Sequence, residues 1–593
     1  MRTFYFDVEI YPNYFLASFL RDDGKLFEFE IYKDVTFNPK RLKAFMLDKR
    51  FMFISFNGIK FDIPVIGEAL KNPKSPGIVN VLRDKIIKEN IRPWAYGKWA
   101  NGINHIDLIE VAPGFASLKL YGGRMASIKL QDLPVHPDKH ITDDERAILR
   151  KYCVNDLTTT RDLHQRLLKQ IDLREQMNKQ LNIKNGGFGD LRSKSDAQVA
   201  ETVFRERLWN EHQISCERPS LPKNYSFKYK APYFLKFEGN TLNAIFEDVK
   251  NSTFTLSDKG QPVAPDALKQ IIELNGTKYK LGLGGLHSCE KLQAVVINDD
   301  ELLYEADVAS YYPFIILGQN LYPEHLTESF LHIYRDIVNT RIDAKHSGDK
   351  VTADSLKITI NGSFGKLGSP YSFLYAPQLL IQTTVTGQIA ILMLIEQVNK
   401  NGGQVVSANT DGIVIRCKKT DYDAIHSTCH NWEVDCQFTL EETFYKSLHS
   451  KDVNNYIAIT TKDKVKTKGA YASASLMKNT VNSVCIDAVI AYLQTGADIR
   501  TSIYKETDVT KFLTIKTVNG GAIWRGEELG KVVRWYYATD GESIHYITNG
   551  NKVGKSDGAN PMMNIADSIP SNIDYNWYIT DAVKLLENLG VIV

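Results

Sequence analysis

The chain has 593 residues, which is too long for a single hydrophobic core, so we expect two to four domains. Hydrophobic residues make up 43% of it and charged residues 24%, which is the composition of a soluble globular protein. The formal net charge is only +2, so a strongly basic chain is excluded and any nucleic-acid surface must be local.

Neither a membrane span nor a signal peptide is predicted. The most apolar stretch, residues 389–395, is too short to cross a bilayer. The start of the chain, MRTFYFDVEI, lacks the charged-then-apolar order of a signal peptide and is expected to be a strand. The seven cysteines are scattered and contain no C-x-x-C pair, which is typical of reduced thiols. We therefore expect a cytoplasmic protein without membrane contacts.

The first half of the chain predicts mixed strands and helices. Strands are expected at residues 3–8, 14–20 and 26–31, with the Asp-Asp-Gly at 22–24 as a turn between the last two. Another strand is expected at 51–56, followed by a helix through residue 66. Residues 142–145 form a capping-box pattern that starts a further helix. This order predicts an α/β or α+β nuclease-like domain.

Four carboxylates and one tyrosine in this region are candidates for a metal site. Asp7 and Glu9 stand two apart on a strand and therefore share one of its faces. Tyr152 and Asp156 are four apart on a helix and also share a face. Asp62 lies where a strand meets a helix. Carboxylates without Cys or His at ligand spacing select Mg²⁺ or Mn²⁺, so we expect two ions around a phosphodiester, with Tyr152 orienting the attacking water.

A second acidic pair lies in the middle of the chain. One strand is expected to end at Asp307. Residues 404–406 and 413–415 are apolar runs around an Asp-Gly turn signal, which predicts a hairpin with Asp411 at its tip. If the two strands are neighbours, Asp307 and Asp411 can share a pair of divalent ions.

Two helices between these acids carry cations. Arg341 and Lys345 are four apart, residues 346–349 form a turn, and Lys357, Asn361 and Phe364 follow on one face of the next helix. Three cations that face inward from two antiparallel helices would suit a triphosphate, because each contact is a charge-assisted hydrogen bond. A solvated face of ion pairs is the alternative interpretation.

After the hairpin, four lysines alternate along a strand-like run: Lys462, Lys464, Lys466 and Lys468. Alternation on a strand would place all four on one face. Such a row suits a sugar-phosphate backbone. An edge strand protected by lysines is the alternative.

Three short patterns in the first part resemble the motifs of DEDDy-type 3′–5′ exonucleases. They are D-x-E at 7–9, N-x3-F-D at 57–62 and Y-x3-D at 152–156. The segment S-L-K-L at 117–120 stands where such domains often carry a Ser-Leu motif for single strands. The resemblance implies that an unpaired 3′ end contacts Asn57, Phe61, Ser117 and Leu118, although residues 117–120 could equally form a buried helix.

Three further patterns resemble motifs A, B and C of family B DNA polymerases. They are D-x-x-S-x-Y-P at 307–313, K-x3-N-x-x-F-G at 357–365 and T-D-G at 410–412. The resemblance implies an α+β multidomain fold: a ribonuclease H-like 3′–5′ exonuclease domain followed by a right-hand polymerase. The implied limits are exonuclease 1–185, linker and first part of the palm 186–330, fingers 331–368, second part of the palm 369–476 and thumb 477–593.

The same resemblance implies roles for single residues. Asp307 and Asp411 would hold two metal ions, with the Val308 carbonyl as a further ligand, and Tyr312 would exclude a 2′-hydroxyl. The implied nucleotide-binding residues are Tyr311, Tyr312, Arg341, Lys345, Lys357, Asn361 and Phe364. The implied DNA-binding residues in this half are Gly284, Gly285, Gly365, Tyr456, Lys466 and Lys468. Residues 531–537 would belong to a thumb that holds duplex DNA.

The chain departs from the family pattern at several positions. Asn409 replaces the first aspartate of motif C, and motif B has Gly362 for Ser and Phe364 for Tyr. Three DNA contacts are softened, at Gly282 (which stands where the family has an aromatic residue), Gln388 and Asn454. Asp307 and Lys357 are 50 residues apart and Asn361 and Asn409 are 48 apart, which leaves little room for the insertions of the protein-primed branch. We therefore expect extension from a nucleic-acid primer, in a compact enzyme similar to those of phages.

These patterns predict a DNA-directed DNA polymerase with a proofreading exonuclease, two Mg²⁺ or Mn²⁺ ions per site, and primer–template DNA and dNTPs as ligands. It would act as a monomer on a phage genome in the host cytoplasm, with a single-strand-binding protein, helicase or primase as partners. One alternative is a DEDDy exonuclease whose polymerase domain binds DNA but is inactive. The other is a non-catalytic nucleic-acid-binding scaffold.

Overall fold

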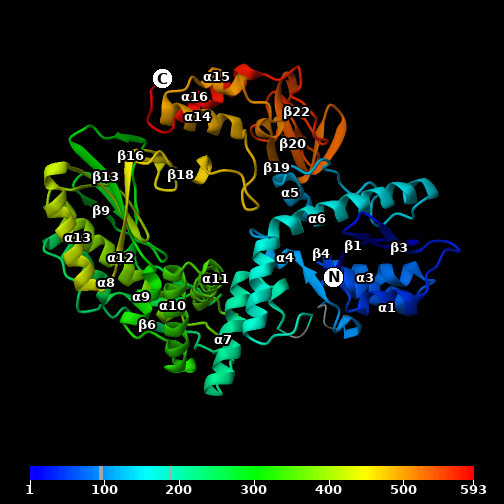
Figure 1. Ribbon diagram of the computed structural model, residues 1–593, viewed down its shortest axis with the longest axis horizontal. Coiled ribbons are helices and arrows are strands. Elements are labelled where there is room, and N and C mark those ends of the chain that lie inside the picture. The colour runs from blue at the N-terminus through cyan, green and yellow to red at the C-terminus, as the bar shows by residue number, and fades with distance from the viewer. Residues whose placement is uncertain (92–97, 187–188, 593) are drawn as a thin grey trace. The chain divides into compact units, whose positions relative to one another are not determined.

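The structure is a computed structural model that describes residues 1–91, 98–186 and 189–592. It has a mixed α+β fold in two compact units (Figure 1). The first unit comprises Met1–Ser195, Ser473–Val484 and Ile503–Tyr578, and the second comprises Asp196–Ala472, Cys485–Ser502 and Ile579–Val593. The five functional regions expected from the sequence stay a prediction. None of the seven cysteines forms a disulfide, as expected.

The first unit is built on a five-stranded sheet. Its central strand β1 pairs antiparallel with β2 and parallel with β4, because a helix-containing crossover separates β1 from β4. The strand order is β3-β2-β1-β4-β5. All four strands predicted for this region are confirmed: β1 (Arg2–Tyr11), β2 (Tyr14–Arg21), β3 (Leu26–Ile31) and β4 (Phe51–Ser55), with β5 (His105–Asp107) in addition.

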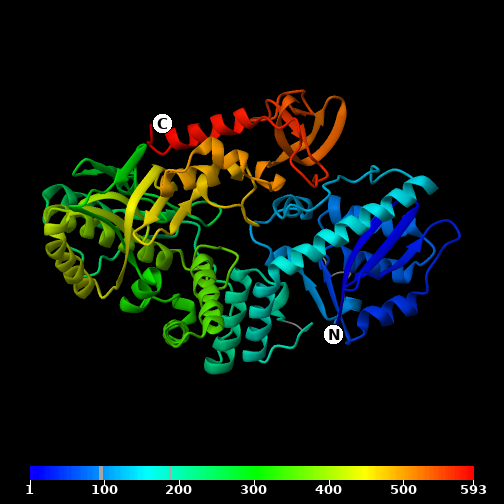
Figure 2. The ribbon, with the colours of Figure 1, turned by 45° about the horizontal axis from the view of Figure 1, so that its top comes forward.

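Helices cover both faces of this sheet. One face, which includes Phe4 and Phe53, packs on α1 (Pro39–Leu47), α2 (Asp62–Lys71) and α3 (Pro76–Lys88). The other packs on α4 (Leu108–Val111), α5 (Leu118–Arg124) and the long α6 (Asp143–Gln180), which runs beside the strands (Figure 1 and Figure 2). The predicted capping box starts α6, since the Thr142 and Glu145 side chains each accept a hydrogen bond from the other's backbone N–H.

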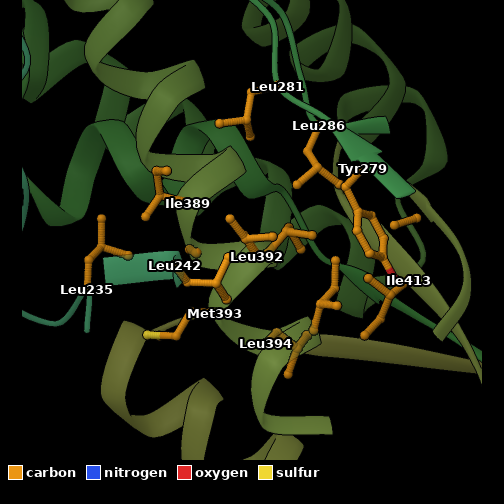
Figure 3. Close-up of a cluster of buried hydrophobic side chains, with 14 of the residues drawn as sticks. Leu235, Leu242, Tyr279, Leu281, Leu286, Ile389, Leu392, Met393, Leu394 and Ile413 are labelled. Atoms are coloured by element: carbon orange, nitrogen blue, oxygen red, sulfur yellow. The ribbon is translucent and has the colours of Figure 1, made fainter. Parts of the chain in front are cut away.

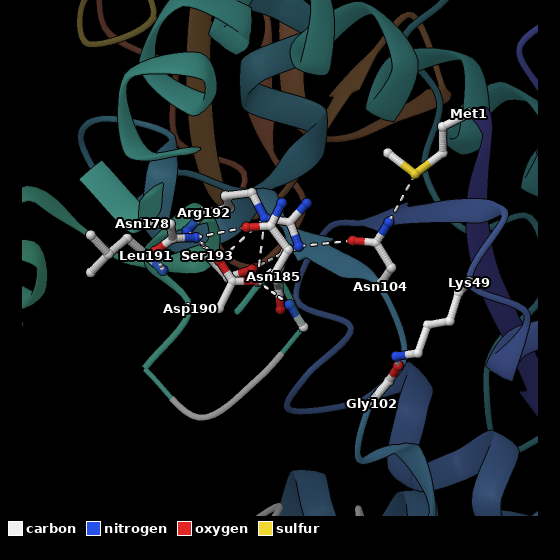
Figure 4. Close-up of polar contacts among 12 residues, drawn as sticks. Met1, Lys49, Gly102, Asn104, Asn178, Asn185, Asp190, Leu191, Arg192 and Ser193 are labelled. Atoms are coloured by element: carbon white, nitrogen blue, oxygen red, sulfur yellow. Dashed lines mark hydrogen bonds and ion pairs between the residues drawn. The ribbon is translucent and has the colours of Figure 1, made fainter. Parts of the chain in front are cut away.

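A buried arginine ties the end of α6 to the sheet (Figure 4). The Arg192 side chain is fully buried, pairs with Asp190 at 2.8 Å and donates to the Asn104 side chain at 2.8 Å. Asn178, on α6, donates to Asp190 at 2.8 Å. Because Asn104 directly precedes β5, this network holds α6 in a fixed position along the sheet.

A second sheet completes the first unit. It consists of β19 (Thr514–Trp524), β20 (Glu527–Glu542), β21 (His545–Tyr546) and β22 (Ala559–Pro561), in the order β21-β19-β20-β22. Fully buried Arg534, on β20, donates to the carbonyls of Ser127 and Ile128 and so attaches this sheet to the segment after α5. Residues 532–537 are buried inside β20. The expectation that residues 531–537 belong to a thumb that holds duplex DNA stays a prediction, and of these residues only Lys531 has an exposed side chain.

The second unit contains a larger, antiparallel sheet. Its order is β14-β15-β13-β16-β17-β18, and β12 also pairs with β16. The hairpin predicted around Asp411 is confirmed, and its second strand lies beside the strand that carries Asp307. The strands are β12 (Gln293–Val296), β13 (Glu301–Val308), β14 (Gln404–Asn409), β15 (Gly412–Lys418), β16 (Leu440–Asp452), β17 (Asn455–Thr460) and β18 (Val465–Lys468).

One face of this sheet covers the main core of the unit. The core includes α8 (Asn240–Asn251), α12 (Pro377–Lys400) and α13 (Tyr422–Cys436), and Figure 3 shows Leu242, Ile389 and Leu392 packed together within it. Residues 389–395 belong to a longer helix than expected: within the described residues, α12 is the one helix long and apolar enough to cross a membrane. Because 89% of its most apolar window is buried inside the protein, we interpret it as a core helix.

The remaining elements of the second unit are small. A bundle of α7 (Asp196–His212), α10 (Ser329–Ser347) and α11 (Lys350–Leu367) confirms the predicted helical pair, and α9 (Tyr311–Gly318) follows β13. Two three-stranded sheets contain β6 (Ser226–Lys228), β7 (Thr253–Leu256), β8 (Pro262–Val263), β9 (Ile271–Leu274), β10 (Thr277–Lys280) and β11 (His287–Ser288). Three helices towards the C-terminus are each divided between the two units: α14 (Ser483–Thr495), α15 (Ile499–Tyr504) and α16 (Tyr575–Glu587).

Gly362 allows α7 and α11 to pack closely. A Cβ atom at this position would lie 2.6 Å from the Asp196 carbonyl oxygen and 2.9 Å from the Ala200 Cβ. Although serine is the usual residue in the family pattern, we expect Gly362→Ser to destabilise the protein by about 1–3 kcal/mol and to lower the Tm of thermal unfolding. Gly365→Ala is the matched control, because a Cβ there meets nothing within 4 Å. A Gly362→Ser variant as stable as this control would contradict the prediction.

Candidate active sites

The first acidic cluster lies between β1 and α6. Asp7 and Glu9 face α6, and their carboxylate oxygens and the Cys153 Sγ lie within 4.8 Å of one another. The Cys153 thiol donates to Asp7 Oδ2 at 3.8 Å. Glu9 is only 6% exposed. The two-residue spacing on a strand thus brings these carboxylates together as expected, while their catalytic role stays a prediction.

Asp62 is presented by a loop that another acid holds in place. Asn57 adopts a left-handed conformation (φ 69°), and its backbone N–H donates to Asp107 Oδ1 at 2.7 Å. The Ile59 N–H donates to Asp107 Oδ2 at 2.9 Å. Asp62 then begins α2, is 2% exposed and has a buried Oδ1 without a partner among the described residues. Sequence reasoning missed Asp107; its one signal is Glu110 three residues later, which is typical of a helix N-cap.

Burial and mutual repulsion make this cluster unfavourable without a cation. Burial and then the charge of Asp156 raise the pKa of Asp7 to about 7. Burial raises the pKa of Asp156 to about 6, and those of Glu9 and Asp62 rise well above the ordinary range. The pKa of Tyr152, on the same face of α6 as Asp156, is raised by burial and by that carboxylate, so the tyrosine keeps its proton. Such a cluster is a suitable site for hard cations.

We expect the metal-free protein to lose stability as pH rises. An unfolded aspartate has a pKa of about 3.9, so folded Asp7 and Asp156 bind more protons than the unfolded chain above about pH 4. Their contribution to stability is therefore greatest below that pH and is lost as pH rises through about 6 to 7. Mg²⁺ bound by the ionised acids should raise the Tm more at about pH 8 than at about pH 5. Thermal denaturation with Mg²⁺ or EDTA measures this, and an equal effect at both pH values would contradict it.

Lys119 places a cation near the first cluster. It forms an ion pair with Asp132, and its charge lowers the pKa of Asp156 against the larger effect of burial. Asp132 also accepts a hydrogen bond from the Lys531 N–H of β20 at 2.7 Å. Lys119 lies within S-L-K-L but was not recognised from the sequence, because its partner Asp132 is on a separate loop.

The Ser-Leu pair and Phe61 are placed near the start of helices. Ser117 is exposed and caps α5, with its Oγ accepting from the Leu120 N–H at 3.2 Å. Leu118 is the first residue of that helix and is half-buried. Phe61 is the N-cap residue of α2 and packs partly buried against the core. Their proposed contacts with a single strand are not tested by this geometry.

The second acidic pair lines one cavity of about 290 Å³. Asp307 pairs in register with Gly412, so it lies beside the turn that carries Asp411. The Val308 N–H donates to the Asp411 carbonyl at 2.7 Å, which joins the two segments directly. Both acids line the cavity, and the strands β13 and β15 are neighbours. This was the condition under which the sequence predicted that Asp307 and Asp411 can share divalent ions. Asn409 lines the same cavity.

Glu305 is a third acid in this cavity that sequence reasoning missed. It stands two residues before Asp307 on β13, which is the signal that places both on one face. The Tyr445 hydroxyl and the Lys466 ammonium each donate to Glu305 Oε2 at 2.6 Å. Burial, then the charges of Asp411 and Glu305, raise the pKa of Asp307 to about 7. Asp307 therefore also favours a nearby cation.

The expected row of four lysines is only partly present. Lys462 lies in the turn after β17 and Lys464 precedes β18. The prediction that all four lysines share one face of a strand is therefore wrong. The reason is a reversal at residues 461–463, which the alternating letters do not reveal. Lys466 and Lys468 are on β18 and line the cavity together with Tyr456, the register partner of Lys468.

Two aromatic rings, Tyr312 on α9 and Phe364 on α11, stack on each other. Tyr312 stacks on Phe364 with ring centroids 4.5 Å apart, and its hydroxyl donates to the Gly284 carbonyl at 2.6 Å. Tyr311 instead is buried and donates to the Gly387 carbonyl at 2.6 Å. The structure therefore brings Tyr312 and Phe364 together, whereas Tyr311 is only 4% exposed and its expected contact with a nucleotide stays a prediction.

The cations of the helical pair lie near β13 and β16. Arg341 Nη1 donates to Ser310, three residues after Asp307, at 3.1 Å, and its buried Nε has no partner among the described residues. Lys345 pairs with Glu441 at 3.1 Å, and Glu441 is the register partner of Asp307 on β16. Lys357 is exposed on α11. Exposed Asn361 and Gly365 lie on the same helix.

Gln388 holds the glycine-rich loop. The Gly282 N–H donates to Gln388 Oε1 and Gln388 Nε2 donates to the Gly282 carbonyl, both at 2.8 Å. Gly285 packs against the Thr410 side chain, where a Cβ atom would clash. The departure from the family pattern at Gln388 thus has a local reason, since this side chain is buried and fixes the loop under the hairpin turn.

The chain matches no protein-family model and no curated protein. Among solved structures it is similar to the family B DNA polymerase from the hyperthermophilic archaeon Pyrobaculum calidifontis, with 13% sequence identity and a TM-score of 0.42. The match covers 100% of this chain and 78% of that one.

Proposed function

We propose that the chain is a DNA-directed DNA polymerase of family B that adds dNTPs to a primer 3′-hydroxyl and carries a proofreading 3′–5′ exonuclease. The observation that carries this proposal is the convergence of Asp307 and Asp411 on one cavity, with two cations bonded to residues close to Asp307. Lys345 reaches the register partner of Asp307, and Arg341 reaches Ser310 just beyond it.

The residues of both sites fit divalent metal ions. Each site offers oxygen ligands. The Oδ1 atom of Asp62 is buried without a partner among the described residues, so its lone pairs are available to a cation. Asp307 and Asp411, with the Val308 carbonyl, would hold two Mg²⁺ or Mn²⁺ ions. Asp7, Glu9, Asp62 and Asp156 would hold two in the other site. Such ions, when bound, stabilise negative charge that develops on a phosphate.

In the polymerase site the chain's own side chains bind and orient the nucleotide. Arg341, Lys345 and Lys357 would contact the triphosphate through charge-assisted hydrogen bonds. To bind phosphate, Lys345 must break its ion pair with Glu441. This costs little free energy, because the ion pair is exposed. Tyr312 is held by Gly284 and by the Phe364 ring, and this rigid position suits the exclusion of a 2′-hydroxyl. Asn361 and Phe364 would line the nascent base pair.

On the DNA side, Tyr456, Lys466 and Lys468 would contact the primer strand, and Gly284, Gly285 and Gly365 would allow the DNA to approach the backbone. Lys466 forms an ion pair with Glu305 and its charge lowers the pKa of Asp307, so it offsets both acids before DNA binds. The primer-side contacts and the two carboxylates therefore belong to one cavity wall.

In the nuclease site, Tyr152 would orient a water molecule and keep its own proton. Asn57, Phe61, Ser117 and Leu118 would hold the unpaired 3′ end. The strand order β3-β2-β1-β4-β5, with β1 antiparallel to β2 and parallel to β4, is similar to that of ribonuclease H-like domains and supports this assignment. Lys119 would add a positive charge beside Asp156.

The proposal includes the functional regions expected from the sequence, namely exonuclease, palm, fingers and thumb with the limits given above. It also includes replication of a phage genome from a nucleic-acid primer, in the host cytoplasm, by a monomer. A single-strand-binding protein, helicase or primase would be its partners.

A second candidate is an exonuclease with a DNA-binding but inactive polymerase half. Asn409, in place of an aspartate, favours it, because that side chain lines the cavity and accepts a hydrogen bond from the Thr410 N–H at 2.8 Å instead of carrying charge. Gln388, another departure from the family pattern, holds the glycine-rich loop in place and so does not argue for this candidate.

The test is a labelled primer on a longer template with Mg²⁺, with and without dNTPs. We expect growth with dNTPs and shortening of the same strand without them. Shortening without growth under any dNTP condition would favour the second candidate and reject the first. The absence of both, in purified protein that still binds DNA, would favour the non-catalytic scaffold.

A further inference from the structure

A cavity of about 530 Å³ in the second unit belongs to neither acidic site and is lined by potential metal ligands. Two histidines and two glutamates contribute to its wall: His212, His332, Glu324 and Glu328. Among the described residues, no lysine or arginine lines it. The sequence alone does not reveal this group, because its two histidines come from distant parts of the chain.

Buried aromatic rings fix the two helices that carry the histidines. His212 is the last residue of α7, and His332 lies in the first turn of α10. The two helices lie side by side (Figure 1). Phe204 of α7 stacks on Phe330 and Tyr334 of α10, with ring centroids 5.0 Å and 6.3 Å apart. Because all three rings are buried, core packing sets the relative position of the two histidines.

The two imidazole rings are close enough to share one ion. Their centroids are 6.1 Å apart and their planes are inclined by 23°. Two imidazoles bound to one Zn²⁺, with Zn–N distances of about 2.0–2.1 Å, have ring centres roughly 5–6 Å apart. His332 is exposed and His212 is half-buried, so an ion can reach both from the cavity. Neither imidazole has a hydrogen-bond partner within the described part of the chain.

Two glutamates of the same wall can add oxygen ligands. Glu328 stands four residues before His332, a spacing that places both on one face of a helix. Although Glu328 is the N-cap residue of α10, its side chain makes no capping hydrogen bond. Neither Glu324 nor Glu328 forms an ion pair among the residues that the structure describes.

Other acids of the two helices already have a cation. Arg207, on α7, pairs with Glu211 at 2.5 Å and with Asp336 of α10 at 2.8 Å. Glu324 and Glu328 line one cavity without such a partner, and like charges repel each other unless a cation lies nearby. The cavity therefore offers metal ligands and also favours the charge of a metal ion.

The turn that presents the two glutamates is strained. Thr327 has φ 55° and ψ −171°, a backbone region that is almost confined to glycine. It lies between the short helix η5 (Glu324–Leu326) and α10, and it lines the cavity itself. The chain bends there so that Glu324 and Glu328 contribute to the same wall. Strain of this kind is typical of segments that position side chains for a ligand.

We propose that this cavity binds a Zn²⁺ ion between α7 and α10. His212 and His332 would supply two nitrogen ligands, and Glu324 and Glu328 would supply oxygen ligands. Imidazole with carboxylate suits Zn²⁺, whereas Mg²⁺ prefers oxygen alone. No three of these four side chains have ligand atoms within 4.8 Å of one another, so the exposed glutamates and the exposed His332 ring must turn inwards. The lost rotamer freedom is small beside the affinity of such ligands for Zn²⁺.

Isothermal titration calorimetry of the untagged full chain with Zn²⁺ tests the proposal. Mg²⁺ is present in excess, because it competes for the two acidic sites but not for imidazole. We expect one Zn²⁺ ion per chain whose binding depends on the histidines. His212→Ala and His332→Ala should each weaken that binding by at least about a hundredfold, since the ion loses one of two nitrogen ligands. Glu324→Gln combined with Glu328→Gln should weaken it by at least about tenfold.

His346→Ala is the matched control and should leave the affinity for Zn²⁺ unchanged. It is an exposed histidine of the same helix, α10, and it lines none of the described cavities. Zn²⁺ should also raise the Tm of the original protein more than that of His332→Ala. Because His332 is exposed, the Tm of its variant in EDTA should equal that of the original protein, which checks that folding is intact.

An affinity for Zn²⁺ that neither histidine substitution changes would show that the ion binds elsewhere and would overturn the proposal, as would the absence of any Zn²⁺ binding. The outcome is independent of the polymerase proposal, because no residue of either acidic site lines this cavity. Primer extension without Zn²⁺ binding would reject only the metal site. Histidine-dependent Zn²⁺ binding without extension would support the metal site and reject the polymerase.

Discussion

Replacing Asp411 by alanine is expected to lower primer extension by at least about a hundred- to thousandfold while 3′–5′ degradation continues at the original rate. Asp411 lies exposed at the turn between β14 and β15, so its removal leaves the core intact. What is lost is one of the two carboxylates that converge on the cavity beside Asp307. Extension and degradation are both measured on one labelled primer.

The matched control is Asp300→Ala, an exposed acid that precedes β13, which should leave both activities unchanged. Extension by Asp411→Ala at a rate near the original would contradict the assignment of the polymerase site. Loss of both activities together would show instead that the substitution damages the fold, and the circular dichroism and Tm of the variant distinguish that outcome.

The second large effect is expected from Asp7→Asn, which should abolish 3′–5′ degradation and leave extension of a matched primer unchanged. Asparagine keeps the volume of a half-buried side chain but removes its charge, so a divalent ion loses one of its ligands. A mispaired primer end should then persist. The loss of repulsion with Asp156 should also raise the Tm of the metal-free protein at about pH 8, since the pKa of Asp7 is otherwise raised to about 7.

Asp172→Asn, at an exposed position of α6, is the control for this variant and should alter neither activity nor the pH dependence of the Tm. Continued degradation by Asp7→Asn would reject the first acidic cluster as the nuclease site. A Tm that responds to Mg²⁺ equally in the variant and the original protein would separately reject Asp7 as a metal ligand.

Short sequence patterns were sufficient to predict several parts of both sites. Asp7 and Glu9 share a face because strand side chains alternate, and Thr142 and Glu145 start α6 because a capping box satisfies free backbone N–H groups. The Asp-Gly turn predicted the β14–β15 hairpin for the same kind of reason. The lysines at 462–468 show the limit of this reasoning, since alternation in sequence was interrupted by an unrecognised turn.

Contacts between distant segments could not be read from pattern. Asp107 holds the loop before Asp62 across about fifty residues, and Lys119 is positioned by Asp132. Gln388 acquires its role only because α12 passes beside the glycine-rich loop. No local sequence pattern predicts the partner of any of these residues. Each partner is brought close by tertiary packing and not by its spacing along the chain.

The amino-acid sequence by itself determined the carboxylates, their order and the elements that present them, because strand alternation, helix periodicity, capping and turn chemistry act over a few residues. Only the tertiary structure decided that β13 lies beside β15, so that Asp307 and Asp411 share a cavity, and that Glu305 and Lys466 join them. It also decided that residues 532–537 are buried and that three tyrosines far apart in the chain, Tyr225, Tyr322 and Tyr375, line one cavity. These outcomes depend on which faces are buried against one another, a property of the whole packed unit.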